Sequence, residues 1–199
     1  MPTGFALQDA RAQLFAAAER VLIRDGAGRP TSRSVTEEAG VAKGVLHRHF
    51  AAFDDFLAEL VRDRVGQVAA QSGKLREVAG SGTLASNLTE ALIGIFDPVN
   101  LGLAGAVIAR DGLRSRLRVT TPRGLAILTE AAAGLAGYLE AEQELGRIRT
   151  DADGRTLALT LIGTGHLLFA GELGGLPDAS AVQEIVESII VGAEPGIRP

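Results

Sequence analysis

Apolar positions recur at helical spacing along almost the whole of this 199-residue chain, and no convincing run alternates apolar and polar residues as a half-buried strand does. The clearest stripe lies in the fourth expected helix and comprises Phe56, Leu57, Leu60, Val61, Val65 and Val68. Start and stop signals separate nine helices, at about residues 9–24, 31–39, 41–50, 54–78, 83–96, 97–112, 121–145, 151–172 and 180–191. The pattern therefore predicts an all-α fold of about nine helices.

Residues 31–50, which read TSRSVTEEAGVAKGVLHRHF, contain two short expected helices joined by a turn at Gly40. The hydroxyl of Thr31 or of Ser32 can cap the first helix. Gly40 can adopt the left-handed conformation that closes a helix and starts a tight turn. Two short helices joined by a turn that contains glycine are typical of a helix-turn-helix motif.

The second short helix carries the candidate DNA contacts. A helix that enters a major groove about 12 Å wide must be narrow and exposed on one face. Val41, Leu46 and Phe50 are expected to anchor this helix. The predicted DNA-binding residues are Thr31, Ser32, Arg33, Lys43, Gly44, Val45, His47, Arg48 and His49. The alternatives are a solvated charged face for Lys43 and Arg48, and packing against the first helix for His49.

This part of the sequence resembles the TetR family of repressors over about residues 10–62. The matching positions are Arg11, Thr31, Ala39-Gly40-Val41, Lys43-Gly44 and His49-Phe50. The resemblance implies a three-helix helix-turn-helix DNA-binding domain over residues 1–53 and a helical ligand-binding and dimerisation domain over residues 54–199. It also implies a homodimer formed through the last two helices, a palindromic double-stranded DNA operator and a small apolar or amphipathic effector.

Three positions depart from the family pattern. His47 stands where the family usually has a tyrosine that contacts phosphate, and Phe53 stands where it usually has a lysine. Val35-Thr36 replaces the usual Ile-Ala. Losing the lysine removes one phosphate neutralisation, which flattens the salt dependence of DNA binding by about 0.9 units of slope.

Charge is distributed unevenly along the chain, whose net charge is −4. Residues 11–50 hold seven Lys or Arg against four Asp or Glu, whereas residues from 66 onward hold eleven against fifteen. The DNA-binding interpretation therefore depends on local arrangement rather than on net charge. The longest apolar-rich stretch, residues 157–171, is shorter than the roughly 18–20 residues of a membrane span, and no signal-peptide pattern is present. A soluble cytoplasmic protein without a membrane partner is expected.

Four side chains of the second domain are candidate effector contacts: Phe96, Tyr138, His166 and Phe169. Tyr138 and His166 are the polar groups that would orient a ligand in a largely apolar cavity. The alternative interpretation is a set of ordinary core aromatics with a satisfied core histidine.

Enzymatic chemistry is not indicated, and neither a cofactor nor a metal is expected. The chain has no cysteine, and His166 is far in sequence from His47 and His49. Asp54 and Asp55 point about 100° apart on a helix, which suits its first turn better than a paired catalytic site. An all-helical enzyme that works only through carboxylates is the least favoured interpretation. The alternating Arg114, Arg116 and Arg118 are more typical of a solvated or internally paired surface than of a binding site.

The most favoured interpretation is a ligand-responsive transcriptional repressor. The main alternative is a helical interaction protein whose helix-turn-helix no longer reads DNA, an alternative that His47 and Phe53 keep open. Activation and repression of transcription are not distinguished by the sequence.

Overall fold

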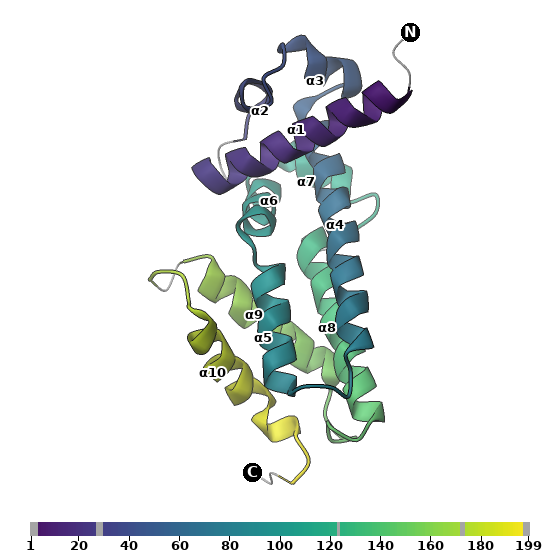
Figure 1. Ribbon diagram of the computed structural model, residues 1–199, viewed down its shortest axis with the longest axis vertical. Coiled ribbons are helices and arrows are strands. Elements are labelled where there is room, and N and C mark those ends of the chain that lie inside the picture. Colours follow the sequence, from purple (N-terminus) through teal and green to yellow (C-terminus); the bar gives the residue numbers. More distant parts are fainter. Residues whose placement is uncertain (1–3, 27–29, 123, 172–173, 197–199) are drawn as a thin grey trace. The chain divides into compact units, whose positions relative to one another are not determined.

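The computed structural model describes residues 4–26, 30–122, 124–171 and 174–196, which form ten α-helices, one 3-10 turn and no strand (Figure 1). The elements are α1 (Gly4–Asp25), α2 (Ser32–Glu38), α3 (Gly44–His49), α4 (Phe53–Glu77), α5 (Leu84–Ile95), α6 (Pro98–Ala109), α7 (Asp111–Leu117), α8 (Ala126–Glu144), α9 (Gly154–Phe169), α10 (Ala179–Ile190) and η1 (Val191–Ala193). The all-α prediction is confirmed. Within the described ranges no single helix is long and apolar enough to cross a membrane, and α5 and α6 meet that test only when counted together across the bend between them.

Several predicted helix boundaries are wrong, two of them by enough to change the elements. The single helix expected over residues 97–112 is divided, because Arg110 has an extended backbone (φ −125°, ψ 103°) that ends α6 and starts α7. The helix expected from Thr121 begins only at Ala126, since Gly124 has a left-handed backbone (φ 78°) that cannot continue a helix. α9 ends at Phe169, and the predicted end at residue 172 lies outside the described residues.

The helices pack as two compact units. The head unit contains Met1–Arg64 together with Pro98–Ala126, and the body unit contains Val65–Asp97 together with Ile127–Pro199. α4 supplies residues to both units. The division into functional domains at residue 53 stays a prediction. By their contacts, α6 and α7 belong to the same compact unit as the N-terminal helices.

The core of the head unit forms around α1, which packs against α2 and α6. Leu14, Val21 and Leu22 of α1 are fully buried, as their helical spacing predicts. α6 approaches α1 closely at Gly102, where an added Cβ would lie 3.0 Å from Cδ2 of Leu22. A larger residue at this position would push the two helices apart.

The body unit is built around α5, α9 and α10, which pack on one another. Phe96, at the end of α5, stacks on Phe169 of α9 with ring centroids 5.5 Å apart. Gly165 lies directly beneath the Phe96 ring, where any Cβ would collide with it. These contacts explain why a glycine stands in the middle of α9.

A buried polar network joins α8 to the start of α5. The Tyr138 hydroxyl donates to Oε1 of Glu142 at 2.6 Å and accepts from Nδ2 of Asn87 at 2.9 Å. The other carboxylate oxygen of Glu142 accepts from the backbone N–H of Gly80 at 3.2 Å and faces Arg147 at 3.4 Å. Burial, and then the hydrogen bond to Glu142, raise the pKa of Tyr138, so the phenol stays a proton donor. A carboxylate that is fully buried is thereby satisfied.

We expect Tyr138→Phe to destabilise the protein by about 1–3 kcal/mol, because it removes one donor from the buried Glu142 carboxylate without changing the ring. For a chain of this size the thermal midpoint should fall by roughly 2–10 °C. Thermal unfolding followed by circular dichroism measures the shift. An unchanged midpoint would show that the network contributes nothing to stability.

Candidate DNA-binding surface

The first helix of the motif, α2, begins at a well-formed cap. Thr31 has an extended backbone, and its Oγ1 accepts from the backbone N–H of Ser34 at 3.0 Å. In return, the Ser34 hydroxyl accepts from the backbone N–H of Thr31 at 2.9 Å. This reciprocal pair confirms that Thr31 caps the helix. Ser32 is the first helical residue, and its Oγ is buried with no hydrogen-bond partner in the described part of the chain.

The turn between α2 and α3 is closed by Gly40, as predicted. Its φ of 67° lies in the left-handed region, which favours glycine. The backbone N–H of Val41 donates back to the carbonyl of Thr36 at 3.0 Å. α3 begins at Gly44, three residues later than the predicted start, because residues 41–43 belong to the turn.

The six-residue helix α3 has one buried and one exposed side. Leu46 and Phe50, the helix's C-cap residue, are buried. The exposed predicted contacts are Lys43, Gly44, His47 and Arg48, and the half-buried ones are Val45 and His49. The arrangement gives the narrow, one-sided helix that entry into a major groove requires.

The exposed side of α3 is free of acidic residues, since residues 39–53 contain no Asp or Glu. The acidic side chains of α2 are engaged elsewhere. Glu38 accepts from Arg20 and Arg24, each at 2.7 Å, and these guanidinium groups lower its pKa. Glu37 is held by Arg33 at 2.7 Å, so that predicted contact carries an ion pair of its own. The positive charges of Lys43 and Arg48 are therefore not opposed locally.

Aromatic side chains hold α3 in place. The Phe50 ring lies edge-on to Phe56 of α4 at 5.1 Å, and Phe15 of α1 lies 5.6 Å from Phe56. The guanidinium of Arg11 lies 5.2 Å over the Phe50 ring and is ion-paired with Glu59. Arg11, which the family resemblance singled out, thus braces the end of α3 through its ring contact.

Phe53, which stands where the resemblance expects a phosphate-binding lysine, is the first residue of α4. Its ring stacks on Phe56 with centroids 5.6 Å apart. The position therefore contributes packing within the head unit instead of a positive charge. The next two residues, Asp54 and Asp55, lie in the first turn of α4 as predicted.

The four predicted effector contacts do not form one cluster. Phe96, His166 and Phe169 lie together, with Phe96 6.3 Å from His166, and the Nδ1 of His166 is buried with no partner within the described ranges. Tyr138 is instead held by Asn87 and Glu142. That these side chains contact an effector stays a prediction.

A cavity of about 370 Å³ lies elsewhere in the body unit, between α4, α5 and α8. Its lining residues are Gln71, Ser72, Lys74, Leu75, Val78, Asn87, Glu90, Ala91, Gly94, Ile95 and Leu135. Sequence reasoning missed them because each is an ordinary position of an amphipathic helix. The one available signal was the small pair Ala91 and Gly94 in the apolar second half of α5.

No group of three or more His, Asp or Glu side chains is arranged to hold a metal ion in the residues that the structure describes. Asp54 and Asp55, the adjacent carboxylates noted in the sequence, are both engaged by arginines. The Asp55 pKa is lowered by its hydrogen bond with Arg116, so this carboxylate is ionised and bound rather than poised for proton transfer.

Residues 14–60 match the model of the family described as bacterial regulatory proteins, TetR family. The fold matches solved structures over nearly the whole chain. A transcriptional regulator from Rhodococcus sp. Rha1 is 24% identical, with a TM-score of 0.68, over 95% of this chain and 99% of that one. A TetR-family regulator from Agrobacterium tumefaciens is 15% identical, with a TM-score of 0.71, over 94% and 98%. A γ-butyrolactone receptor described as ArpA-like is 22% identical, with a TM-score of 0.59, over 95% and 90%. No curated protein matches the chain significantly.

We expect Arg48→Ala to weaken sequence-preferring DNA binding by about 1–3 kcal/mol, the discrimination typical of an arginine that reads a base edge. Fluorescence anisotropy with a labelled duplex measures the change. Arg76→Ala removes an exposed arginine from the α4 segment in the body unit and serves as the control of equal charge. Equal affinities of the two variants would remove Arg48 from the contact surface.

Proposed function

We propose that this chain, whose residues 14–60 match the TetR family of bacterial regulatory proteins, represses transcription as a homodimer on a palindromic DNA operator in the cytoplasm and is released by a small molecule. The observation that carries the proposal is the exposed side of α3, which bears Lys43, His47 and Arg48 without a neighbouring carboxylate. Two such helices, related by the two-fold axis of a dimer, would enter successive major grooves.

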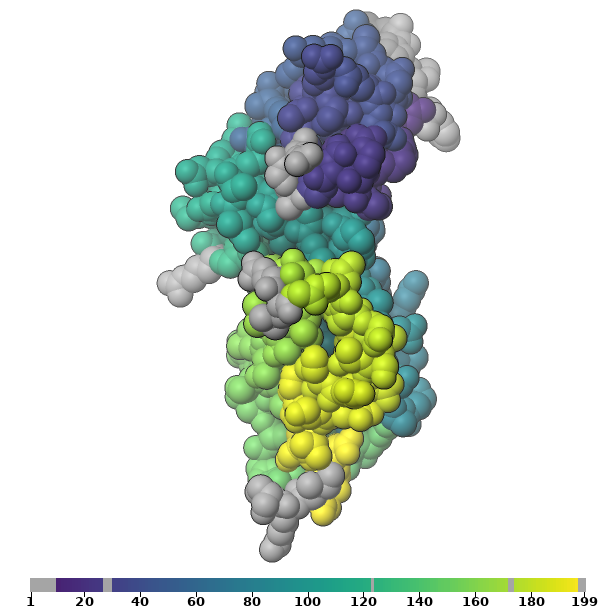
Figure 2. Space-filling view, turned by 90° about the vertical axis from the view of Figure 1, so that its left-hand side faces the viewer, coloured from purple at the N-terminus to yellow at the C-terminus, as the bar shows by residue number. Residues whose placement is uncertain are grey.

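An exposed apolar stripe on α9 supports the homodimer. Leu159 is 64% exposed and Leu167 is 42% exposed, and Gly163 lies between them at helical spacing. Nothing within 4 Å would meet a Cβ at Gly163, so this face is open. The neighbouring α10 lies on the outer surface of the body unit, where it faces the viewer in Figure 2. We propose that α9 and α10 of two chains form a four-helix bundle.

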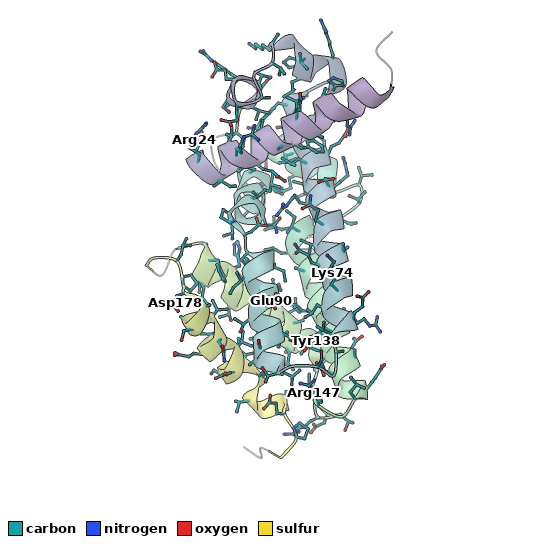
Figure 3. The ribbon with its side chains drawn as sticks, viewed as in Figure 1. Arg24, Lys74, Glu90, Tyr138, Arg147 and Asp178 are labelled. Carbon is teal, nitrogen blue, oxygen red and sulfur yellow. The ribbon has the colours of Figure 1, made fainter. Side chains whose placement is uncertain are left out.

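The cavity between α4, α5 and α8 supports an effector site. Its lining includes the apolar side chains of Leu75, Ile95 and Leu135, and its volume is at the lower end of the range for small-molecule pockets. Lys74 on α4 and Glu90 on α5, both labelled in Figure 3, are exposed at its rim, and neither pairs with another charge in the described residues. Because the rim carries one positive and one negative side chain, it favours a small molecule with an apolar body and a neutral or zwitterionic head.

Gly94 keeps this cavity open. It is the last residue but one of α5. Packing does not require it, since the nearest atom to an added Cβ is Oε1 of Gln71, at 4.0 Å. A side chain at this position would instead extend into the cavity.

α4 offers the route from effector to DNA. Its residues Gln71, Ser72, Lys74 and Leu75 line the cavity in the body unit. Near its other end, Phe56 packs against Phe50 at the end of α3 in the head unit. A ligand that binds one arrangement of this helix more tightly than the other changes the free energy of DNA binding by the difference, typically about 1–3 kcal/mol.

We expect the purified protein to enrich a palindromic sequence from a random pool of duplex DNA at moderate salt. A two-fold symmetric site with half-sites one helical turn or a multiple apart is the signature of a homodimer. Sequencing of the bound fraction after several rounds gives the result. Failure to enrich any sequence would favour the helical interaction protein with a helix-turn-helix that no longer reads DNA.

We expect Gly94→Leu to keep DNA binding and lose release by an effector, because the new side chain fills the cavity far in sequence from α3. A panel of medium-chain lactones, amides, zwitterions, carboxylates and amines, tested for release of the enriched duplex, identifies the responsive class. The control is Gly66→Leu, at an exposed position of α4 where an added Cβ meets no atom within 4 Å. This variant should be released from DNA by the effector as the wild type is. Release that persists in Gly94→Leu would place the effector elsewhere.

A further inference from the structure

The N-terminus of α4 is fastened by two arginines from the α6–α7 segment of the same head unit. Oδ1 of Asp54 accepts from Nε and lies against Nη2 of Arg110, at 2.8 and 2.6 Å. The next residue, Asp55, is ion-paired with Arg116 of α7. All four side chains are between 21% and 37% exposed, so these pairs are only partly screened by solvent.

The two contacts differ in direction. Adjacent residues on a helix point about 100° apart, so Arg110 and Arg116 engage different sides of α4. One such contact leaves a helix free to turn about it, whereas two fix both the position and the rotation of the first turn. Oδ2 of Asp55 also accepts from the backbone N–H of Ala52 at 2.9 Å, which ties the chain leading into α4 to the same point.

A row of rings connects this fastening to α3. The guanidinium of Arg110 lies 5.4 Å over the ring of Phe53, and Phe53 stacks on Phe56. Phe56 in turn lies edge-on to Phe50, the residue that ends α3. Arg110 is thus joined to the end of α3 through three aromatic rings.

The backbone of α7 is shaped to admit the carboxylate. Gly112 lies in the first turn of α7, and any Cβ there would collide with Oδ2 of Asp54. The Nη1 of Arg116 donates to the carbonyl of Gly112 at 2.9 Å, which holds the guanidinium against the same turn. Arg62 of α4 donates to the carbonyl of Arg116 at 3.2 Å. The contact between α4 and α7 therefore involves backbone carbonyls of α7 as well as side chains of both helices.

We infer that Arg110 and Arg116 are positioning residues for DNA binding, which they support without touching DNA by holding the first turn of α4 where Phe56 seats α3. The inference rests on the proposed function. It makes residues 98–126 part of the DNA-reading unit of this chain. At Phe53, where the family resemblance expects a lysine for phosphate, the ring instead anchors Arg110.

The test compares two double variants that lose the same number of charges from the same segment. Arg110→Met with Arg116→Met removes the fastening. Arg114→Met with Arg118→Met is the control, because Arg114 pairs with Asp111 and the backbone of α6, and no ion pair joins either arginine to α4 in the described residues. The probe is a fluorescein-labelled duplex of the sequence that the wild-type protein enriches, and anisotropy is read well below each thermal midpoint.

We expect the Arg110/Arg116 variant to bind the duplex about 10-fold more weakly than the control variant, the size expected from two partly exposed ion pairs and one cation–π contact. Arg110→Lys with Arg116→Lys, which keeps both charges, should recover part of this loss. The difference in DNA affinity between the double methionine variant and the wild type should narrow as the salt concentration rises, because salt screens the ion pairs of the wild type. If the double methionine variant does not fold, each single methionine variant is compared with Arg114→Met.

Affinity within 2-fold of the control, with only the thermal midpoint lowered, would show that the pairs stabilise the fold and do not position α3. That result overturns the inference and leaves the proposed function standing. If the wild-type protein enriches no DNA sequence at all, the proposed function and the positioning role are both overturned.

Discussion

The second helix of the motif, α3, has six residues, and a helix of that length does not hold its shape in water. Its conformation has to come from outside, through the two side chains that it buries, Leu46 and Phe50. Phe50 meets Phe15 of α1 and Phe56 of α4, and Arg11 covers its ring. The rest of the head unit can be understood as the set of contacts that keeps this short helix exposed on one side.

An acidic protein can present a basic surface if its carboxylates are used elsewhere. In the head unit they are: Glu38 is bound by Arg20 and Arg24, Glu59 by Arg11, and Asp54 by Arg110. These pairs are partly exposed and each contributes little to stability. Their consequence is electrostatic, because the exposed side of α3 keeps its positive charge while the acidic side chains around it are neutralised.

In the proposed function, the two units divide the work of a ligand-controlled repressor, and α4 supplies residues to both. In the body unit, four of its residues between 71 and 75 line a cavity whose size and rim suit a small amphipathic molecule. In the head unit, its first turn seats α3 and is gripped by Arg110 and Arg116. In the proposed regulation, α4 would transmit the effect of a bound ligand to α3, because one end of it lines the cavity and the other end packs against Phe50.

Local rules were sufficient for the helix-turn-helix and for the all-α fold. The Thr31 cap, the left-handed Gly40 and the spacing of Leu46 and Phe50 depend on residues within a few positions of one another, and the sequence displays them directly. Tertiary structure alone decided what depends on residues distant in sequence. Asp54 meets Arg110 across 56 positions and Asp55 meets Arg116 across 61, and no periodicity reveals such pairs. The separate helix α7, the cavity beside Gly94 and the burial of Tyr138 against Glu142 share that cause, since each is set by which distant helices come to pack together.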